Sequence, residues 1–124
     1  MNPRVILIVG SVGTRRTHVR AALEAEGYTV QEAANAADAL AIVAGSRPDL
    51  VVVDLRPFPD DSFALTKSLR ALPGGSTMSI VAVIDPLADV APNRLMEADL
   101  TDYLVSPLDV AHLLKIIHLH LPLR

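Results

Sequence analysis

Three short, nearly continuous runs of branched aliphatic residues most constrain how this chain can fold. They are Val5–Val9, Leu50–Asp54 and Ile80–Ile84. A strand with one face in water alternates apolar and polar residues, whereas a strand buried on both faces is apolar almost throughout. These runs therefore predict the central strands of a parallel sheet that is covered on both faces by helices.

Two further runs complete a set of five. Tyr28–Glu32 alternates, which is typical of an edge strand, and Tyr103–Val105 is short. Helical patterns lie between the runs, and they are expected over residues 14–26, from an Asn35 N-cap to Gly45, from a cap at Asp60, Asp61 or Ser62 to Leu72, over residues 89–98, and from Pro107 to about Leu121. Because each β–α–β unit crosses over in the right-handed sense, the pattern predicts a doubly wound α/β fold, (βα)₅, in three layers.

Length and composition narrow the function. The 124 residues suit one domain, 1–124, and half of them are hydrophobic, so a real core can form. A net charge of −3 gives no basic footprint for direct binding of nucleic acid. No cysteine is present, which excludes disulfides and thiolate metal sites, and no apolar run is long enough to span a membrane. A soluble cytoplasmic domain that does not bind a membrane is expected.

The ligand crevice of an open α/β sheet lies beyond the carboxyl ends of its strands. The residues expected at these ends are Gly10 and Ser11 after the first strand, Asp54 at the end of the third, Ile84 and Asp85 at the fourth, and Ser106 after the fifth. A carboxylate at Asp54 would be held on a rigid strand at this crevice. The alternative for a lone Asp is an ordinary polar strand terminus.

Three stretches of the sequence carry a family resemblance. They are Arg47–Leu55 (RPDLVVVDL), Asp102–Asp109 (DYLVSPLD) and Ala33–Leu40 (AANAADAL). With the order of elements, they make the chain similar over its whole length to the receiver domain of bacterial response regulators, the CheY-like, flavodoxin-like fold. The resemblance implies a role in two-component (phosphorelay) signal transduction, with a histidine kinase, an output domain or another signalling protein as partner, and no enzymatic function of its own.

The resemblance also implies a phosphorylation site. In the family, the Asp that ends the third strand accepts a phosphoryl group, and Asp54 occupies that position. Two acidic residues after the first strand help to hold Mg²⁺, a Thr or Ser at the fourth strand binds the phosphoryl group, and a Lys after the fifth pairs with a phosphate oxygen. An aromatic residue that reports the phosphorylation state matches Tyr103.

This chain departs from the family pattern at every helper position. Gly10 and Ser11 replace the acidic pair, Ile84 replaces the Thr or Ser, Ser106 replaces the Lys, and Asp85 adds an acid. Since Mg²⁺ requires carboxylate oxygens, Asp54 alone is a weak candidate ligand, and no cofactor is expected. The sequence therefore predicts a pseudo-receiver that works by protein contact. The alternative is a phosphorylatable receiver that uses Mg²⁺ and accepts phosphate at Asp54 from a histidine kinase.

Arg56 is the one nearby cation that could substitute. A guanidinium binds a carboxylate through two hydrogen bonds, so Arg56 could pair with Asp54 or Asp85 and lock the pocket without metal. The alternative is an Arg56 that points to solvent. Tyr103 likewise has two interpretations, a switch residue or an edge tyrosine with its hydroxyl in water, because Ile84 breaks the family's coupling to it.

Two other kinds of site are less well supported. The turn Gly10–Gly13 could draw a small anion or nucleotide to the helix that follows, but it lacks the spacing of the known phosphate loops. No catalytic residue is expected, because the four histidines, His18, His112, His118 and His120, all fall on predicted helices. His118 and His120 are two residues apart and face different sides of a helix, so they make a poor metal pair.

The last predicted helix has apolar residues over a wider part of its circumference than a single buried stripe requires. Its apolar positions are 113, 114, 116, 117, 119 and 121. Spare apolar surface often marks a partner site. In the resembled family, the last strand and the last two helices often form such a surface, so a homodimer or a docking contact is expected there. The alternative is that Leu119 and Leu121 form a frayed apolar end.

Overall fold

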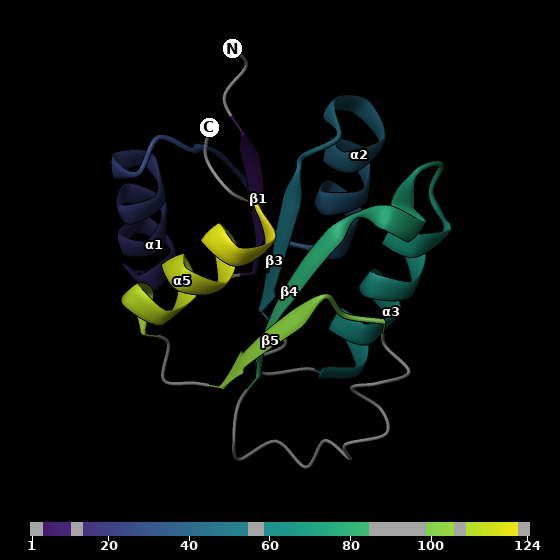
Figure 1. Cartoon of the computed structure of the whole chain (residues 1–124). Helices are drawn as coiled ribbons and strands as arrows, with labels where there is room; N and C mark the ends of the chain where they lie inside the picture. The colour runs from purple at the N-terminus through teal and green to yellow at the C-terminus, as the bar shows by residue number, and fades with distance from the viewer. Residues whose placement is uncertain (1–3, 11–13, 55–58, 85–98, 106–108, 122–124) are drawn as a thin grey trace.

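In the computed structural model, which describes residues 4–10, 14–54, 59–84, 99–105 and 109–121, five strands form one parallel sheet (Figure 1). They are β1 (Val5–Val9), β2 (Thr29–Ala33), β3 (Leu50–Asp54), β4 (Ser79–Ile84) and β5 (Asp102–Val105). The order β2-β1-β3-β4-β5 places β2 and β5 at the edges. The predicted α/β sheet is confirmed, and each strand lies within one residue of its expected position.

Helices cover both faces of this sheet. They are α1 (Thr14–Ala25), α2 (Ala36–Ser46), α3 (Pro59–Ala71), the short 3₁₀ helix η1 (Gly75–Thr77) and α5 (Val110–His120). Figure 1 shows α1 and α5 on one side of the sheet and α2 and α3 on the other. The helix expected over residues 89–98 lies outside the described residues. No helix in the described part of the chain has the length and apolarity to cross a membrane.

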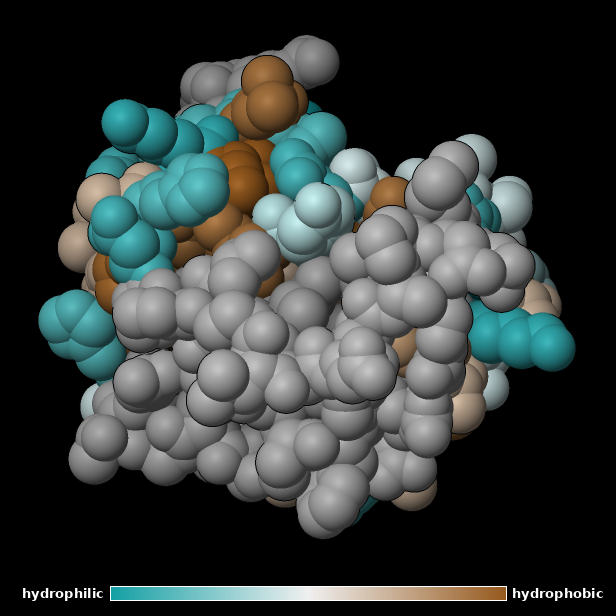
Figure 2. All heavy atoms as spheres, turned by 90° about the horizontal axis from the view of Figure 1, so that it is seen from below, coloured by the Kyte–Doolittle hydropathy of each residue, from teal (hydrophilic) through white to brown (hydrophobic). Residues whose placement is uncertain are grey.

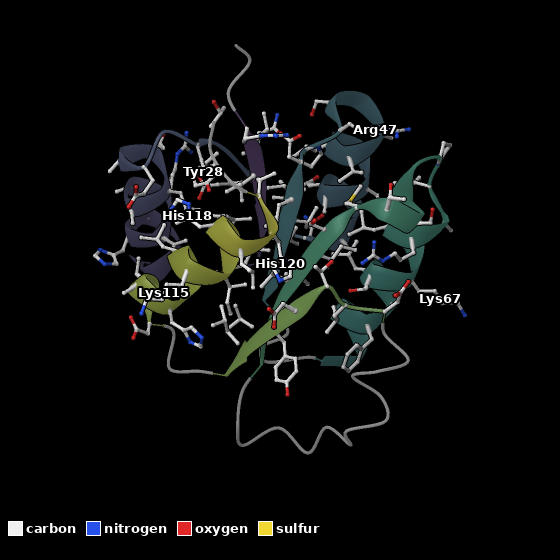
Figure 3. The ribbon with its side chains drawn as sticks, viewed as in Figure 1. Tyr28, Arg47, Lys67, Lys115, His118 and His120 are labelled. Atoms are coloured by element: carbon white, nitrogen blue, oxygen red, sulfur yellow. The ribbon has the colours of Figure 1, made fainter. Side chains whose placement is uncertain are left out.

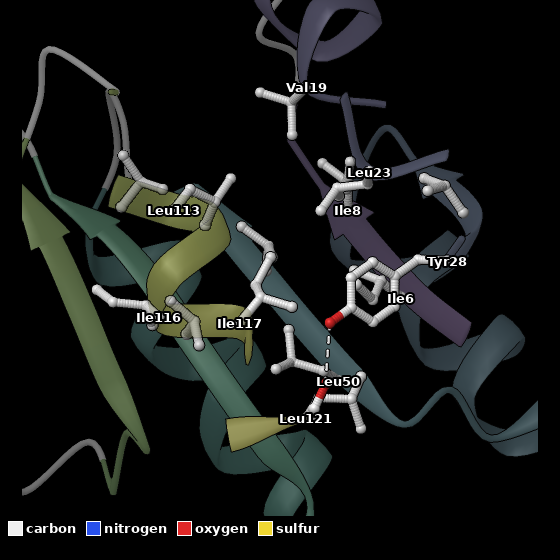
Figure 4. Packing of buried hydrophobic residues seen from close by; sticks show 14 of the residues in the cluster. Ile6, Ile8, Val19, Leu23, Tyr28, Leu50, Leu113, Ile116, Ile117 and Leu121 are labelled. Atoms are coloured by element: carbon white, nitrogen blue, oxygen red, sulfur yellow. Dashed lines mark hydrogen bonds between the residues drawn. The ribbon is translucent and has the colours of Figure 1, made fainter. Parts of the chain in front are cut away.

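Strand residues alternate between two hydrophobic clusters. In β1, Ile6 and Ile8 pack into the cluster on the side of α1 and α5, whereas Leu7 and Val9 pack into the cluster on the side of α2 and α3 (Figure 4 shows the first cluster). The central residues of β3 and β4 divide in the same way. Burial on both faces is the reason that the three central strands are apolar except at Asp54 and Ser79, which lie at strand ends.

Three helix ends differ from the sequence prediction. Gly45 does not end α2, which continues to Ser46 and closes at Arg47, whose φ of 45° is left-handed and whose N–H bonds to the carbonyl of Val43. The third helix begins earlier, at Pro59, where the missing N–H of proline is harmless. The last begins later, at Val110, because the Asp109 side chain caps it by accepting from the N–H of Ala111.

Substitution by alanine is expected to change the free energy of unfolding in opposite directions at two glycines. An added Cβ at Gly45 would meet nothing within 4 Å, whereas at Gly75, which is buried, it would lie 2.0 Å from the carbonyl oxygen of Leu69. Gly45→Ala is expected to raise the free energy of unfolding by about 0.5–1 kcal/mol, because alanine loses less entropy in a helix. Gly75→Ala is expected to lower it by about 1–3 kcal/mol through overpacking. Urea unfolding of both variants checks this, and equal effects would contradict it.

Candidate functional site

The strand register brings the predicted site positions to one edge of the sheet. Val9 pairs with Val53, so the next residues, Gly10 and Asp54, lie at the same level on neighbouring strands. On the other side of β3, Asp54 pairs with Val83, the residue before Ile84. This is the carboxyl edge of the sheet, at the lower end in Figure 1, where the sequence placed the crevice.

Four of the predicted pocket residues lie outside the described residues. They are Ser11, Arg56, Asp85 and Ser106. For Asp54 and Ile84 the structure describes the backbone, which ends β3 and β4 as expected. The pairing of Arg56 with an acid, and the anion-binding turn Gly10–Gly13, therefore stay predictions.

Gly10 is the described member of the pair that replaces the family's acids. Its φ is 138°, a backbone conformation that L side chains rarely adopt, and its N–H donates to the carbonyl of Ala33 at 3.0 Å. This hydrogen bond continues the pairing of β1 with β2 by one residue beyond the end of β1. Gly10 thus offers no side-chain oxygen and does not fit a Mg²⁺ site. Among the described residues, no group of three acidic or histidine side chains could hold a metal ion either.

Tyr103 lies on the edge strand β5, where it pairs with Ala82 of β4. It is 46% exposed, and its backbone N–H donates to the Asp102 carboxylate at 2.8 Å. Its neighbour Leu104, by contrast, is buried in the cluster beneath α5. Tyr103 is thus exposed at the edge of the sheet, and both interpretations of it stay predictions.

His118 and His120, at the end of α5, point in different directions and contact different residues, as their spacing predicted (Figure 3). His120 Nε2 lies 3.0 Å from the carboxylate of Asp102, at the start of β5. The Tyr28 hydroxyl donates to the carbonyl of Leu121 at 2.9 Å and lies 3.1 Å from His118 Nδ1 (Figure 4). The Tyr28 hydroxyl therefore lies within hydrogen-bond distance of both groups.

These contacts were not foreseen from the sequence, in which a frayed end at Leu119 and Leu121 was the alternative to a partner surface. Leu121 is buried and Leu119 is 71% exposed, so the two differ. Burial, with the nearby Glu26 carboxylate as a lesser cause, raises the pKa of Tyr28 above its ordinary value. The neutral hydroxyl is therefore the form that the folded protein favours.

Arg70 is a second residue that the sequence did not single out. Its guanidinium is mostly buried and donates to the carbonyls of Asp99, Gly75 and Met78. One side chain thus ties the end of α3 to the residues before β4 and β5. Its sequence signal, one Arg in the last turn of a helix, is shared by many surface arginines.

Comparison with known proteins bears on the function of the carboxyl edge of the sheet. Residues 6–118 match the family model described as response regulator receiver domain. Protein PilH of Pseudomonas aeruginosa is 30% identical over 115 residues, which cover 91% of this chain and 93% of that protein. Response regulators MprA of Mycobacterium are 28% identical over 112 residues, 90% of this chain, which spans 48% of their length.

A solved structure shows the same fold. The receiver domain of the sensor histidine kinase PA1611 from Pseudomonas aeruginosa PAO1 superimposes with a TM-score of 0.84 and 25% identity, covering 96% of this chain and 98% of that one. That crystal structure has a magnesium ion coordinated in its active site cleft.

The positive φ of Gly10 predicts that restoring an acid there lowers stability. Gly10→Asp is expected to lower the free energy of unfolding by about 1–3 kcal/mol, because an L side chain is disfavoured at this φ. Gly10→Ala separates strain from charge, and a similar loss is expected. Thermal and urea unfolding measure both. Wild-type stability in both variants would show that the backbone relaxes freely.

The Tyr28 hydroxyl predicts a pH-dependent contribution to stability. Tyr28→Phe is expected to lower the free energy of unfolding by about 1 kcal/mol near neutral pH, because the Leu121 carbonyl loses its donor. The folded-state pKa of Tyr28 is raised, so its contribution is fully present below the unfolded pKa, about 10, and is lost as the pH rises through the folded pKa. The gap between wild type and Tyr28→Phe should therefore narrow above about pH 10.

Urea unfolding at several pH values measures this gap. Tyr103→Phe is the matched control, and as a change at a half-exposed residue it should stay within about 0.5 kcal/mol of wild type. A gap between wild type and Tyr28→Phe that stays constant through the alkaline range would contradict the assigned contribution of Tyr28.

Proposed function

This chain belongs to the response regulator receiver domain family of two-component signalling, and on that premise we propose that it is a pseudo-receiver. It transmits a signal through contacts with other signalling proteins, with little or no stable phosphorylation of Asp54. A histidine kinase, an output domain or another signalling protein is the expected partner. The molecule performs no catalysis of its own in this proposal.

The conformation of Gly10 is the observation that carries the proposal. A receiver that uses Mg²⁺ needs carboxylate oxygens beside its phosphoacceptor, and Gly10 lies at the level of Asp54 without a side chain. Its positive φ shows a backbone adapted to glycine. The identities of Ser11, Ile84 and Ser106 support the same conclusion, because none of them supplies the acid, the hydroxyl at the fourth strand or the cation that the family uses.

One observation favours the alternative, a receiver that is still phosphorylated. Asp54 is retained at the end of β3, at the carboxyl edge of the sheet. A carboxylate nucleophile can attack a reactive phosphate without the full set of helpers, only more slowly, since each missing charge leaves the phosphate oxygens less neutralised. In this case Mg²⁺ would be held by fewer protein oxygens than is usual.

Intact mass after incubation with acetyl phosphate and Mg²⁺ tests the proposal. No phosphate-sized gain is expected for the wild type, which must also give a folded spectrum. The double variant Ser11→Asp, Ser106→Lys restores one acid and the cation and is expected to gain phosphate. A gain by the wild type that Asp54→Asn abolishes would establish the alternative and refute the pseudo-receiver.

A further inference from the structure

Strand β5 has one side that faces away from β4, here called the free side of β5. Among the described residues, β5 is the last strand in the order β2-β1-β3-β4-β5 and pairs with β4 alone. Backbone N–H and C=O groups on the free side of an edge strand can pair with a strand of another molecule, which leads to association or aggregation. The groups that occupy this side therefore decide whether the sheet can be extended at β5.

One backbone group on the free side of β5 is bonded to a side chain. The N–H of Tyr103 donates to Oδ1 of Asp102, the preceding residue, at 2.8 Å. Successive N–H groups of a strand point alternately to its two sides. Because this N–H bonds to a side chain of β5 itself and not to β4, it lies on the free side. The Asp102 carboxylate thus takes up a donor that an added strand would use.

A second contact holds this carboxylate in place. Oδ2 of Asp102 lies 3.0 Å from Nε2 of His120, which is in the last turn of α5 (Figure 3). An ionised carboxylate accepts and does not donate, so the imidazole N–H donates to it. Asp102 lies two residues before Leu104, on the same face of the strand, and Leu104 is buried beneath α5. The carboxylate therefore joins the free side of β5 to the end of α5.

The composition of β5 makes such protection useful. Tyr103 and Val105 belong to the residue types that favour strands, and Tyr103 is 46% exposed. Figure 2 shows hydrophobic atoms beside hydrophilic ones on the side of the molecule where α5 lies. Exposed hydrophobic side chains on an edge strand favour the addition of a further strand, which would cover them.

We propose that the Asp102 carboxylate closes the free side of β5 to strand addition and that His120 positions it. An added strand needs the Tyr103 N–H as a donor, and this donor is already bonded. The strand would also have to displace or bury the carboxylate, and removing that charge from water costs free energy. The inference goes beyond the proposed function, because it implies that proteins contact this side of the molecule through side chains and not by continuing the sheet.

Amide hydrogen exchange of the full chain, followed by NMR, tests the bond to Tyr103. In the wild type the Tyr103 N–H should exchange at least about tenfold more slowly than an unprotected amide, although it faces away from β4. Asp102→Ala should accelerate this exchange at least about tenfold, after correction for the intrinsic rate of the altered sequence. The N–H of Ile8 in the central strand β1 is the internal control, because its exchange requires opening of the sheet.

Two further variants separate the acceptor oxygen from its positioning. Asp102→Asn keeps an acceptor for the Tyr103 N–H, so the exchange rate should stay within about threefold of the wild-type rate. His120→Ala leaves the carboxylate but removes its second partner, and should accelerate the exchange of Tyr103 by about two- to fivefold. These variants and the wild-type rate test the assignment even where Asp102→Ala is too unstable to measure.

Cross-linking between two copies of the chain tests the closure itself. A two-fold axis through an antiparallel pair of β5 strands would place residue 103 opposite its own equivalent, with Cα atoms about 5.5 Å apart, within reach of a disulfide. The chain has no cysteine, so Tyr103→Cys introduces a single thiol. With copper phenanthroline as oxidant, the disulfide dimer should form at least about tenfold faster when Asp102→Ala is added. Lys67→Cys, at an exposed position on α3, reports random collisions and should not respond to Asp102→Ala.

Three outcomes would overturn the proposal. They are a Tyr103 N–H that exchanges freely in the wild type, an effect of Asp102→Ala on Tyr103 no larger than its effect on Ile8, and Tyr103→Cys dimers that form equally fast with and without Asp102. None of these readouts depends on phosphorylation, so a phosphate gain at Asp54 would refute the pseudo-receiver and leave this result standing.

Discussion

Burial of the three central strands on both faces is the constraint on which the rest of the structure depends. Residues of β1, β3 and β4 are almost wholly removed from water, and neither face of these strands could be left bare. Each crossover must therefore lay a helix on the sheet and return the chain to the same edge. The carboxyl ends of the strands gather there as a result, which is why Gly10 and Asp54 lie at one level although 44 residues separate them in the chain.

The two edges of the sheet are held by different means. At the amino edge, side chains bind across elements: the Asp49 carboxylate accepts from the N–H of Val5 at 2.7 Å, and the Thr101 hydroxyl accepts from the N–H of Ile80 at 2.9 Å. Arg70 and the Asp102–His120 pair act at the same edge. The carboxyl edge carries the candidate site. These contacts thus lie at the edge of the sheet opposite to the one that carries Asp54.

Much of the fold could be predicted from the sequence because its strands are continuous and sharply bounded. The helix ends were harder: the preference of Gly45 for helix ends was overridden, and Arg47 took the left-handed position that glycine usually takes. The identity of Gly10 indicated a missing acid, but its positive φ and its hydrogen bond to Ala33 could not be predicted from the sequence.

The long-range side-chain contacts likewise could not be predicted from the sequence. The partners of Tyr28 lie 90 and 93 residues away, and their pairing follows only once the packing of α5 is known. Arg70 shows the same limit, because its three carbonyl partners come from turns whose approach depends on the sheet. Periodicity identifies what a helix buries, and it does not say which polar groups its end will meet.

The bond between Tyr28 and Leu121 also has a kinetic meaning. It joins groups 93 residues apart, so it closes only after the crossovers between β2 and α5 have been made. Closing so long a loop costs chain entropy, so we expect this contact to form after the transition state for folding. The strength of this contact then affects mainly the unfolding rate and hardly the folding rate. The contact at the end of α5 is therefore expected to prolong the lifetime of the folded state more than it accelerates folding.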